Sequence, residues 1–179
     1  STERDLDALE TSTVLEGRTT PNGVLFQFAT PVYRKRLTKD ESIIEQLNED
    51  IIREAKQLQE EDEEGKKWCE THYQGGYTSY GTMRSLVGYS SVIQSMEGMI
   101  RRHMRDFGRI AQIENVNALF MTDCWMNVMG KGTEHIWHRH GQSTISGTYY
   151  VKTPKRCSGI CFEDPRAEKI MALKQRPVV

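Results

Sequence analysis

The stretch HIWHRHGQSTISGTYYV, residues 135–151, decides the predicted fold class of this chain. Three of the five histidines fall within its first six positions, directly before an apolar, β-branched run. Isoleucine, threonine, tyrosine and valine favour strands, so the run predicts a β-strand. The histidines therefore precede a strand, either as polar residues on a wet sheet edge or as ligands of a metal ion.

The spacing of the histidines decides which of them can act together. Side chains at positions i and i+2 of a strand point to the same face, with Cα atoms roughly 6.6 Å apart. His138 and His140 can therefore converge on one metal ion from a single strand end. Imidazole suits Fe(II), Zn(II), Cu and Ni, so the pair does not select the metal. His135 is at an odd spacing from His138, and a regular strand would turn it away unless the turn at 130–134 continues that far.

Short β-prone segments within this stretch and on either side of it extend the strand prediction from residue 117 onward. They are ALFMTDCWMNVM, IWHRH, TISGTYYV and SGICFED, separated by glycine, lysine and proline turns. Upstream, apolar residues at helical spacing predict amphipathic helices over about 39–62 and 90–112. Thr38 and Glu41 fit a capping box at the start of the first helix. Residues 68–86, with paired glycines and four aromatics, are interpreted as an ordered loop.

Two helices followed by a run of strands predict an α+β fold, with helices packed outside an antiparallel sheet or barrel. We interpret residues 1–20 as a flexible N-terminal arm and residues 21–179 as a single domain. Within that domain, helical support covers about 38–112 and the β core about 117–179. A chain of 179 residues is long enough to bury a substantial core.

Composition excludes some classes of function. The formal net charge is −1, so no basic field supports binding to nucleic acid or to a membrane. No apolar run approaches the ~20 residues that span a bilayer, and the N-terminus lacks the apolar core of a signal peptide. Four scattered cysteines are typical of reduced thiols, which places the protein in the cytoplasm.

The block over residues 123–166 resembles a family of 2-oxoglutarate/Fe(II)-dependent oxygenases related to the prolyl and aspartyl hydroxylases. The matching pieces are W-x-N at 125–127, H-x-x-H-x-H at 135–140, S-G-x-Y-Y-V at 146–151 and F-x-D-P-R at 162–166. Upstream, FATPVY and GGYTSYGTM look similar to the same family. The resemblance implies a double-stranded β-helix (jelly-roll) core with flanking helices. It also implies Fe(II) and 2-oxoglutarate as cofactors, and oxidative attack on a C–H bond.

The resemblance implies a metal site at the histidines. His138 matches the first metal ligand, and His140 stands where the family usually has a carboxylate. A three-histidine site would keep the facial geometry and make the metal site one charge more positive. Alternatively, His140 is not a ligand and water fills its place. His135 is a further candidate ligand.

Related enzymes hold the carboxylates of 2-oxoglutarate with polar side chains on the strands that flank the first ligand. Asn127 precedes His138 by 11 residues and Tyr149 follows it by 11, so both are candidates for binding the cosubstrate. Their amide and phenol groups can donate hydrogen bonds to a carboxylate. Tyr150 is the alternative on the opposite face, and Arg166 is the nearby arginine with a family match.

The family pattern continues with a distal metal-binding histidine and an arginine that pairs with 2-oxoglutarate. No histidine follows His140 in this sequence. A jelly roll without its last strands would expose unpaired edges and half its core. We therefore expect the C-terminal strands to be lacking here, and a longer protein or another chain to complete the site.

The resulting hypothesis is a non-haem Fe(II)/2-oxoglutarate dioxygenase that hydroxylates an unidentified small-molecule or protein side-chain substrate. One alternative is a catalytically inactive jelly-roll module that binds a partner or assembles into a homo-oligomer. Another is a cupin-like metal enzyme that uses histidines alone and no 2-oxoglutarate. Metal analysis combined with a 2-oxoglutarate titration separates the three.

Overall fold

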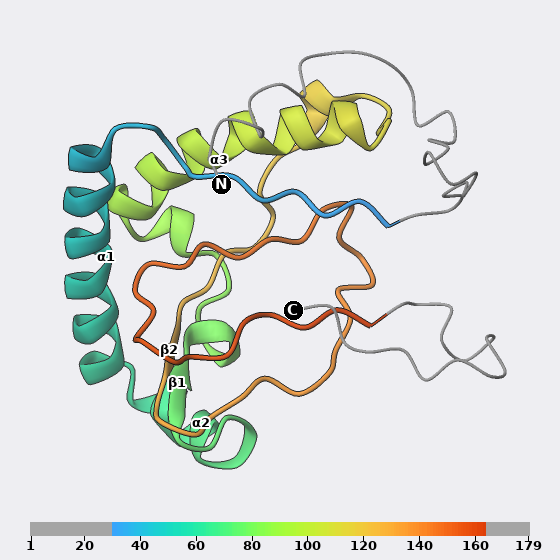
Figure 1. The fold of residues 1–179 in the computed structure, drawn as a ribbon. Coiled ribbons are helices and arrows are strands. Elements are labelled where there is room, and N and C mark those ends of the chain that lie inside the picture. The colour runs from blue at the N-terminus through green and yellow to red at the C-terminus, as the bar shows by residue number, and fades with distance from the viewer. Residues whose placement is uncertain (1–29, 164–179) are drawn as a thin grey trace, which may run out of the picture. The chain divides into compact units, whose positions relative to one another are not determined.

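The computed structural model describes residues 30–163, which fall into two compact units divided after Ile145. The predicted arm at 1–20 and the candidate Arg166 lie outside the described residues. In the first unit the helices are α1 (Glu41–Glu61), α2 (Glu63–His72) and α3 (Ser91–Ile110), and the strands are β1 (Gly76–Thr78) and β2 (Asn127–Met129) (Figure 1). Residues 146–163 contain neither a helix nor a strand.

Both predicted helices are confirmed, as α1 and α3. The apolar stripe of α1 is buried at Leu47 and Ile51, and that of α3 is buried at Ile93 and Met96. Their first halves line a shared groove, and the α3 N-cap Ser90 donates a hydrogen bond to a carboxylate of α1. Local periodicity was sufficient to find these helices because their apolar faces pack against each other.

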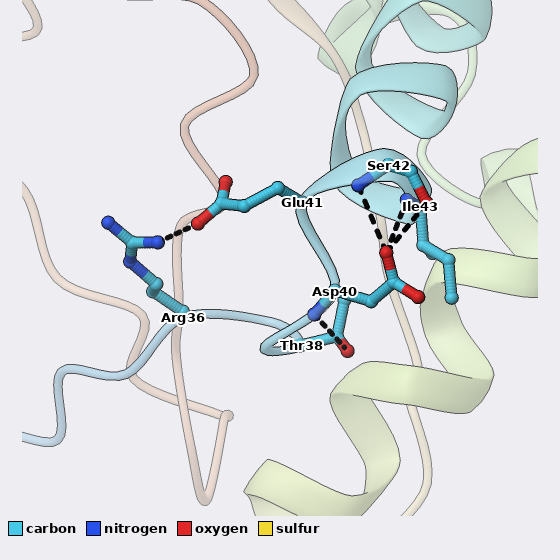
Figure 2. A network of polar contacts seen from close by, with 6 residues as sticks. All are labelled: Arg36, Thr38, Asp40, Glu41, Ser42 and Ile43. Carbon is cyan, nitrogen blue, oxygen red and sulfur yellow. Dashed lines mark hydrogen bonds and ion pairs between the residues drawn. The ribbon is translucent and has the colours of Figure 1, made fainter.

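The start of α1 differs from the predicted capping box by two residues. Asp40 is the N-cap, and its carboxylate accepts hydrogen bonds from the backbone N–H of Ser42 (3.0 Å) and Ile43 (3.4 Å), as Figure 2 shows. Thr38 instead accepts a bond from the Asp40 N–H (3.3 Å), and Glu41 pairs with Arg36. The Ser42 hydroxyl and the Ile43 N–H lower the pKa of Asp40. An aspartate caps better than the predicted threonine because its full charge also faces the positive end of the helix dipole.

Asp62 joins α1 to α2 and connects both helices to the core. Its carboxylate accepts hydrogen bonds from the Gly65 N–H (2.8 Å), the Tyr77 hydroxyl (2.7 Å) and the Thr82 hydroxyl (2.6 Å). Tyr77 lies in β1 and is 1% exposed. Burial alone would raise the pKa of Asp62, but these hydrogen bonds and the charge of Lys66 leave it below its usual value. The junction therefore depends on an ionised aspartate.

The only sheet within the described residues is the antiparallel pair β1 and β2, in which Tyr77 lies opposite Val128. Glycines allow this close approach: a Cβ on Gly130 would lie 2.1 Å from the Gly75 carbonyl oxygen. Gly75 also has φ +80°, a left-handed conformation that glycine adopts without strain. The prediction that 68–86 is a loop was therefore wrong, because this stretch contains the end of α2 and the whole of β1.

The predicted β core is the largest difference between expectation and structure. Between 117 and 163 the structure shows β2 and an isolated bridge from Cys124 to Ser85, and no further strand. The described residues are thus mostly helical with a two-stranded sheet. Alternation and β-branching identify segments that can form strands, but a strand also needs a partner edge. Ile136 and Trp137 are 81% and 63% exposed, so the segment around the histidines is not buried by the described residues.

Candidate metal centre

The three clustered histidines lie in the segment that follows β2. The turn at its start is closed by Thr133, whose N–H and hydroxyl both donate to the Gly130 carbonyl (3.3 and 2.8 Å). Beyond the turn, the side chains of His135, His138 and His140 are all exposed. The β1–β2 pair therefore positions this segment at its base, while the histidines remain largely exposed and Tyr73 covers part of His135.

His138 and His140 lie side by side, at a ring separation compatible with a shared metal ion. Their ring centroids are 4.9 Å apart, with the ring planes at 78°. Two imidazoles that bind one metal at about 2.1 Å, at right or tetrahedral angles, have centroids roughly 4.5–5.3 Å apart. The pair can therefore supply two donors. Among residues 30–163, no three His, Cys, Asp or Glu side chains gather closely enough to hold a metal ion.

A hydrogen bond to the nearby backbone orients the ring of His138. Nδ1 lies 2.7 Å from the Ile136 carbonyl oxygen, which can only accept, so Nδ1 carries the proton. The lone pair of the neutral ring then resides on Nε2, the atom available to a metal. Metal-bound histidines commonly use their second nitrogen in this way, because the bond fixes the tautomer and the ring orientation.

His135 is occupied by a different partner. Its Nε2 lies 3.1 Å from the hydroxyl of Tyr73, the C-cap of α2, and the two ring centroids are 5.0 Å apart. Partial burial beside Tyr73, and then the nearby His138, lower the pKa of His135, which favours the neutral ring as acceptor. Burial raises the pKa of Tyr73 to about 12, so the phenol keeps its proton. With its ring centroid 6.0 Å from that of His138, His135 is less suited to the shared site than His140.

A series of aromatic ring contacts begins at His140. The Trp125 ring lies 5.8 Å from His140, and Tyr80 meets Trp125 edge-on at 5.0 Å. Tyr80 belongs to the GGYTSYGTM motif noted in the sequence and lies in a short 3-10 helix, Ser79–Gly81, directly after β1. Its neighbours Thr78 and Ser79 are buried and support the fold, whereas Tyr80 is 37% exposed. The motif thus contributes one exposed ring beside the histidine segment.

The candidate residues for 2-oxoglutarate fall in both units. Asn127 begins β2, opposite Thr78, and is exposed. Tyr149 and Tyr150 belong to the second unit, where Tyr149 is half-buried and Tyr150 is 54% exposed. Nothing tests their roles, which stay predictions.

Two residues near the site were not found from the sequence. Tyr73 reaches His135 from the end of α2, and Arg84 covers the Tyr80 ring with its guanidinium carbon 4.3 Å from the centroid. The GGYTSYGTM motif lies between them and is the only signal that pointed to this region. The motif does not show that the flanking Tyr73 and Arg84 lie near the histidine segment, because tertiary packing determines those contacts.

Comparison with known proteins agrees with the resemblance seen in the motifs. Residues 123–178 match the model of a family described as "Putative 2OG-Fe(II) oxygenase", which confirms the resemblance for this part of the chain. The matched residues include all three clustered histidines and the four candidates for 2-oxoglutarate binding. No curated protein matches the chain. None of the helices between residues 30 and 163 is long and apolar enough to cross a membrane.

Proposed function

We propose that this chain carries the iron-binding histidines of a 2-oxoglutarate-dependent dioxygenase that hydroxylates a small-molecule or protein side-chain substrate. The observation that carries the proposal is the His138–His140 pair, with ring centroids 4.9 Å apart inside the stretch that matches the oxygenase family. The oriented His138 ring adds support, because the hydrogen bond at Nδ1 leaves the Nε2 lone pair available to a metal.

The donor set fits Fe(II) in part. Imidazole is a good ligand for Fe(II), and a facial set of three ligands leaves positions for a bidentate keto acid and O₂. When bound, iron and 2-oxoglutarate supply oxidative hydroxylation of a C–H bond, with O₂ consumed and succinate and CO₂ released. His138 and His140 would provide two of the three ligands. The third would come from outside the described residues or from a second copy of the chain.

The remaining roles in this proposal belong to the cosubstrate pocket. The Asn127 amide and the Tyr149 phenol would donate hydrogen bonds to the carboxylates of 2-oxoglutarate, with Tyr150 and Arg166 as further candidates. The proposal includes a double-stranded β-helix, in which β1 and β2 would be one strand pair. Solvent-exposed Ile136 and Trp137 support a further layer over the histidine segment. The four free cysteines suit the reducing cytoplasm.

Metal analysis together with a 2-oxoglutarate titration tests the proposal on the complete protein. The dioxygenase predicts about one Fe(II) per complete site and saturable binding of 2-oxoglutarate that requires the metal. Metal binding without 2-oxoglutarate binding would instead indicate the histidine-only, cupin-like enzyme. Binding of neither would indicate a module that acts by assembly, and would reject the proposal.

A further inference from the structure

Arg84 is held in a fixed position beside the aromatic rings that lead to the histidine pair. Its Nε donates a hydrogen bond to the Tyr80 carbonyl oxygen (3.0 Å), and its guanidinium lies over the Tyr80 ring. The backbone is fixed as well, because the Cys124 N–H donates to the Arg84 carbonyl oxygen (2.7 Å). Side chain and backbone together leave this exposed arginine less freedom than is usual at a surface.

The anchored guanidinium keeps its best binding groups available. Within residues 30–163, the Arg84 side chain contacts Tyr80, and neither Nη atom has an ion-pair partner. Two parallel N–H groups on a planar guanidinium match the two oxygens of a carboxylate. Because the side chain is already ordered, binding costs little conformational entropy.

The position of Arg84 relates it to the proposed metal site. The hydrogen bond to Cys124 places Arg84 beside the residue that precedes Trp125. The Trp125 ring in turn contacts both Tyr80, beneath the guanidinium, and His140 of the histidine pair. Arg84 itself lies outside the stretch that matches the oxygenase family. A cation outside the shared segment is suited to selecting the substrate rather than to holding the common cosubstrate.

We propose that Arg84 anchors a carboxylate of the substrate, whose body lies along the Tyr80 and Trp125 rings toward His140. The substrate class is then a carboxylate attached to an apolar or flat body. The assignment of this ligand as a substrate rests on the proposed dioxygenase function. The distal carboxylate of 2-oxoglutarate offers the same chemistry, so the experiment must distinguish these two sources.

Benzoate and benzamide are matched probes, because they share the flat ring and differ in charge. In the full chain without added metal, NMR would follow the Trp125 indole N–H and the Arg84 Nε–H during titration with each compound. Saturable shifts with benzoate and none with benzamide are expected. Arg84→Gln should weaken benzoate binding about tenfold to hundredfold, since it loses the charged hydrogen bonds. Arg84→Lys should retain part of the affinity, because it keeps the charge and loses the paired geometry.

Arg109→Gln is the control, because Arg109 is an exposed arginine of α3 paired with Asp106. It should leave benzoate binding unchanged. Equal binding by wild type and Arg84→Gln would overturn the proposal, and so would equal losses in the Arg84 and Arg109 variants or absence of benzoate binding to the wild type.

A competition experiment separates the two carboxylate sources. In the full chain loaded with Fe(II) under anaerobic conditions, 2-oxoglutarate should not displace benzoate from Arg84 if the anchor serves the substrate. Displacement of benzoate from wild-type Arg84 by 2-oxoglutarate would assign the anchor to the cosubstrate and overturn the substrate assignment. Because the benzoate titration needs no iron, its failure is distinguishable from failure of the dioxygenase function, which the metal and 2-oxoglutarate measurements report.

Discussion

The Tyr73 hydroxyl lies 3.1 Å from Nε2 of His135, which joins the end of α2 to the histidine segment across 62 residues of sequence. The phenol, with its pKa raised to about 12, can serve only as a neutral partner at physiological pH. His135, with its pKa lowered by burial and by His138, is the matching neutral acceptor. This contact distinguishes His135 from His138. Nε2 of His135 is engaged with Tyr73, whereas His138 uses Nδ1 for its hydrogen bond and leaves Nε2 free.

The first prediction concerns the titration of His135 in the metal-free full chain. The unfolded chain takes up this proton near pH 6.5, whereas the folded chain resists it until lower pH. The contribution to stability is therefore complete above about pH 6.5 and is lost as pH falls through the lowered pKa. Histidine NMR should show a midpoint below 6.5. Tyr73→Phe should keep the midpoint low because burial remains, and Tyr73→Ala should raise it toward the ordinary value. A wild-type midpoint at or above 6.5 would contradict the assignment.

The second prediction concerns Asp62, which accepts hydrogen bonds from Gly65, Tyr77 and Thr82. Asp62→Ala should lower the free energy of unfolding by about 2–3 kcal/mol, because it leaves the buried Tyr77 hydroxyl without its acceptor. Tyr77→Phe removes one bond and keeps the packing, so it should cost about 1 kcal/mol. Urea unfolding followed by circular dichroism measures both.

The pH dependence of the same site has a defined sign. The pKa of Asp62 is lower in the folded chain than the value of about 3.9 in an unfolded chain. Its contribution is therefore present above about pH 4 and is lost as pH falls through the folded-state pKa. Asp62→Asn should flatten that part of the stability profile. A variant whose acid unfolding matched the wild type would show that the carboxylate does not stabilise the junction.

The third prediction concerns the glycines that allow β1 and β2 to approach. Gly130→Ala would place a Cβ 2.1 Å from the Gly75 carbonyl oxygen, so the two strands must separate. A loss of about 2 kcal/mol or more in the free energy of unfolding is expected. Gly98→Ala is the matched control, because Gly98 lies in α3 and a Cβ added there would meet open space. It should stabilise the chain by roughly 0.5–1 kcal/mol. Equal effects of the two substitutions would argue against a close strand approach.

The sequence-based predictions were accurate where local contacts determine the structure, and inaccurate where contacts between residues distant in sequence determine it. The helices α1 and α3 were predictable because their apolar periodicity is local, whereas the N-cap was misplaced because Thr38 and Asp40 both fit local capping chemistry. The strand β1 was missed because its pairing depends on glycine contacts with residues about fifty positions away. Jelly-roll strands were expected from β-prone segments that, within the described residues, have no partner edge.

The same reasoning applies to the candidate site. The proximity of His138 and His140 was expected from their i, i+2 spacing, and their ring centroids lie 4.9 Å apart; their role as ligands stays a prediction. Tyr73 and Arg84 were not predictable, because a tyrosine or an arginine near a turn has no pattern that identifies its tertiary neighbour. Their contacts with His135 and Tyr80 are visible only once the chain is folded.

The fourth prediction concerns the cosubstrate residues Asn127 and Tyr149. In the complete protein, Asn127→Ala and Tyr149→Phe should each weaken 2-oxoglutarate binding by about 1.5–3 kcal/mol, the cost of a lost hydrogen bond to a carboxylate. Metal content should remain nearly unchanged, because neither residue is a proposed ligand. Calorimetric titration beside elemental analysis measures both quantities. Unchanged affinity in both variants would reassign these residues to structural roles.

The last prediction concerns the His138–His140 pair and its metal. Neutral imidazole binds metal and imidazolium does not, so iron retention in the complete protein should fall on acidification. His138→Ala should abolish iron binding and 2-oxoglutarate turnover together, because the metal loses the ligand that Ile136 orients. His135→Ala should do less, since His135 is engaged with Tyr73.

The variants of His140 decide how it acts. If His140 replaces the usual carboxylate, alanine should remove the iron, while His140→Asp should retain it by restoring a set of two histidines and one carboxylate. If His140 only supports the ligands, His140→Ala should keep iron bound with about 10–100-fold weaker affinity or activity. Elemental analysis and succinate formation distinguish these results. Normal iron content after His138→Ala would show that the metal site lies elsewhere, and that the 4.9 Å histidine pair is a polar surface of the segment.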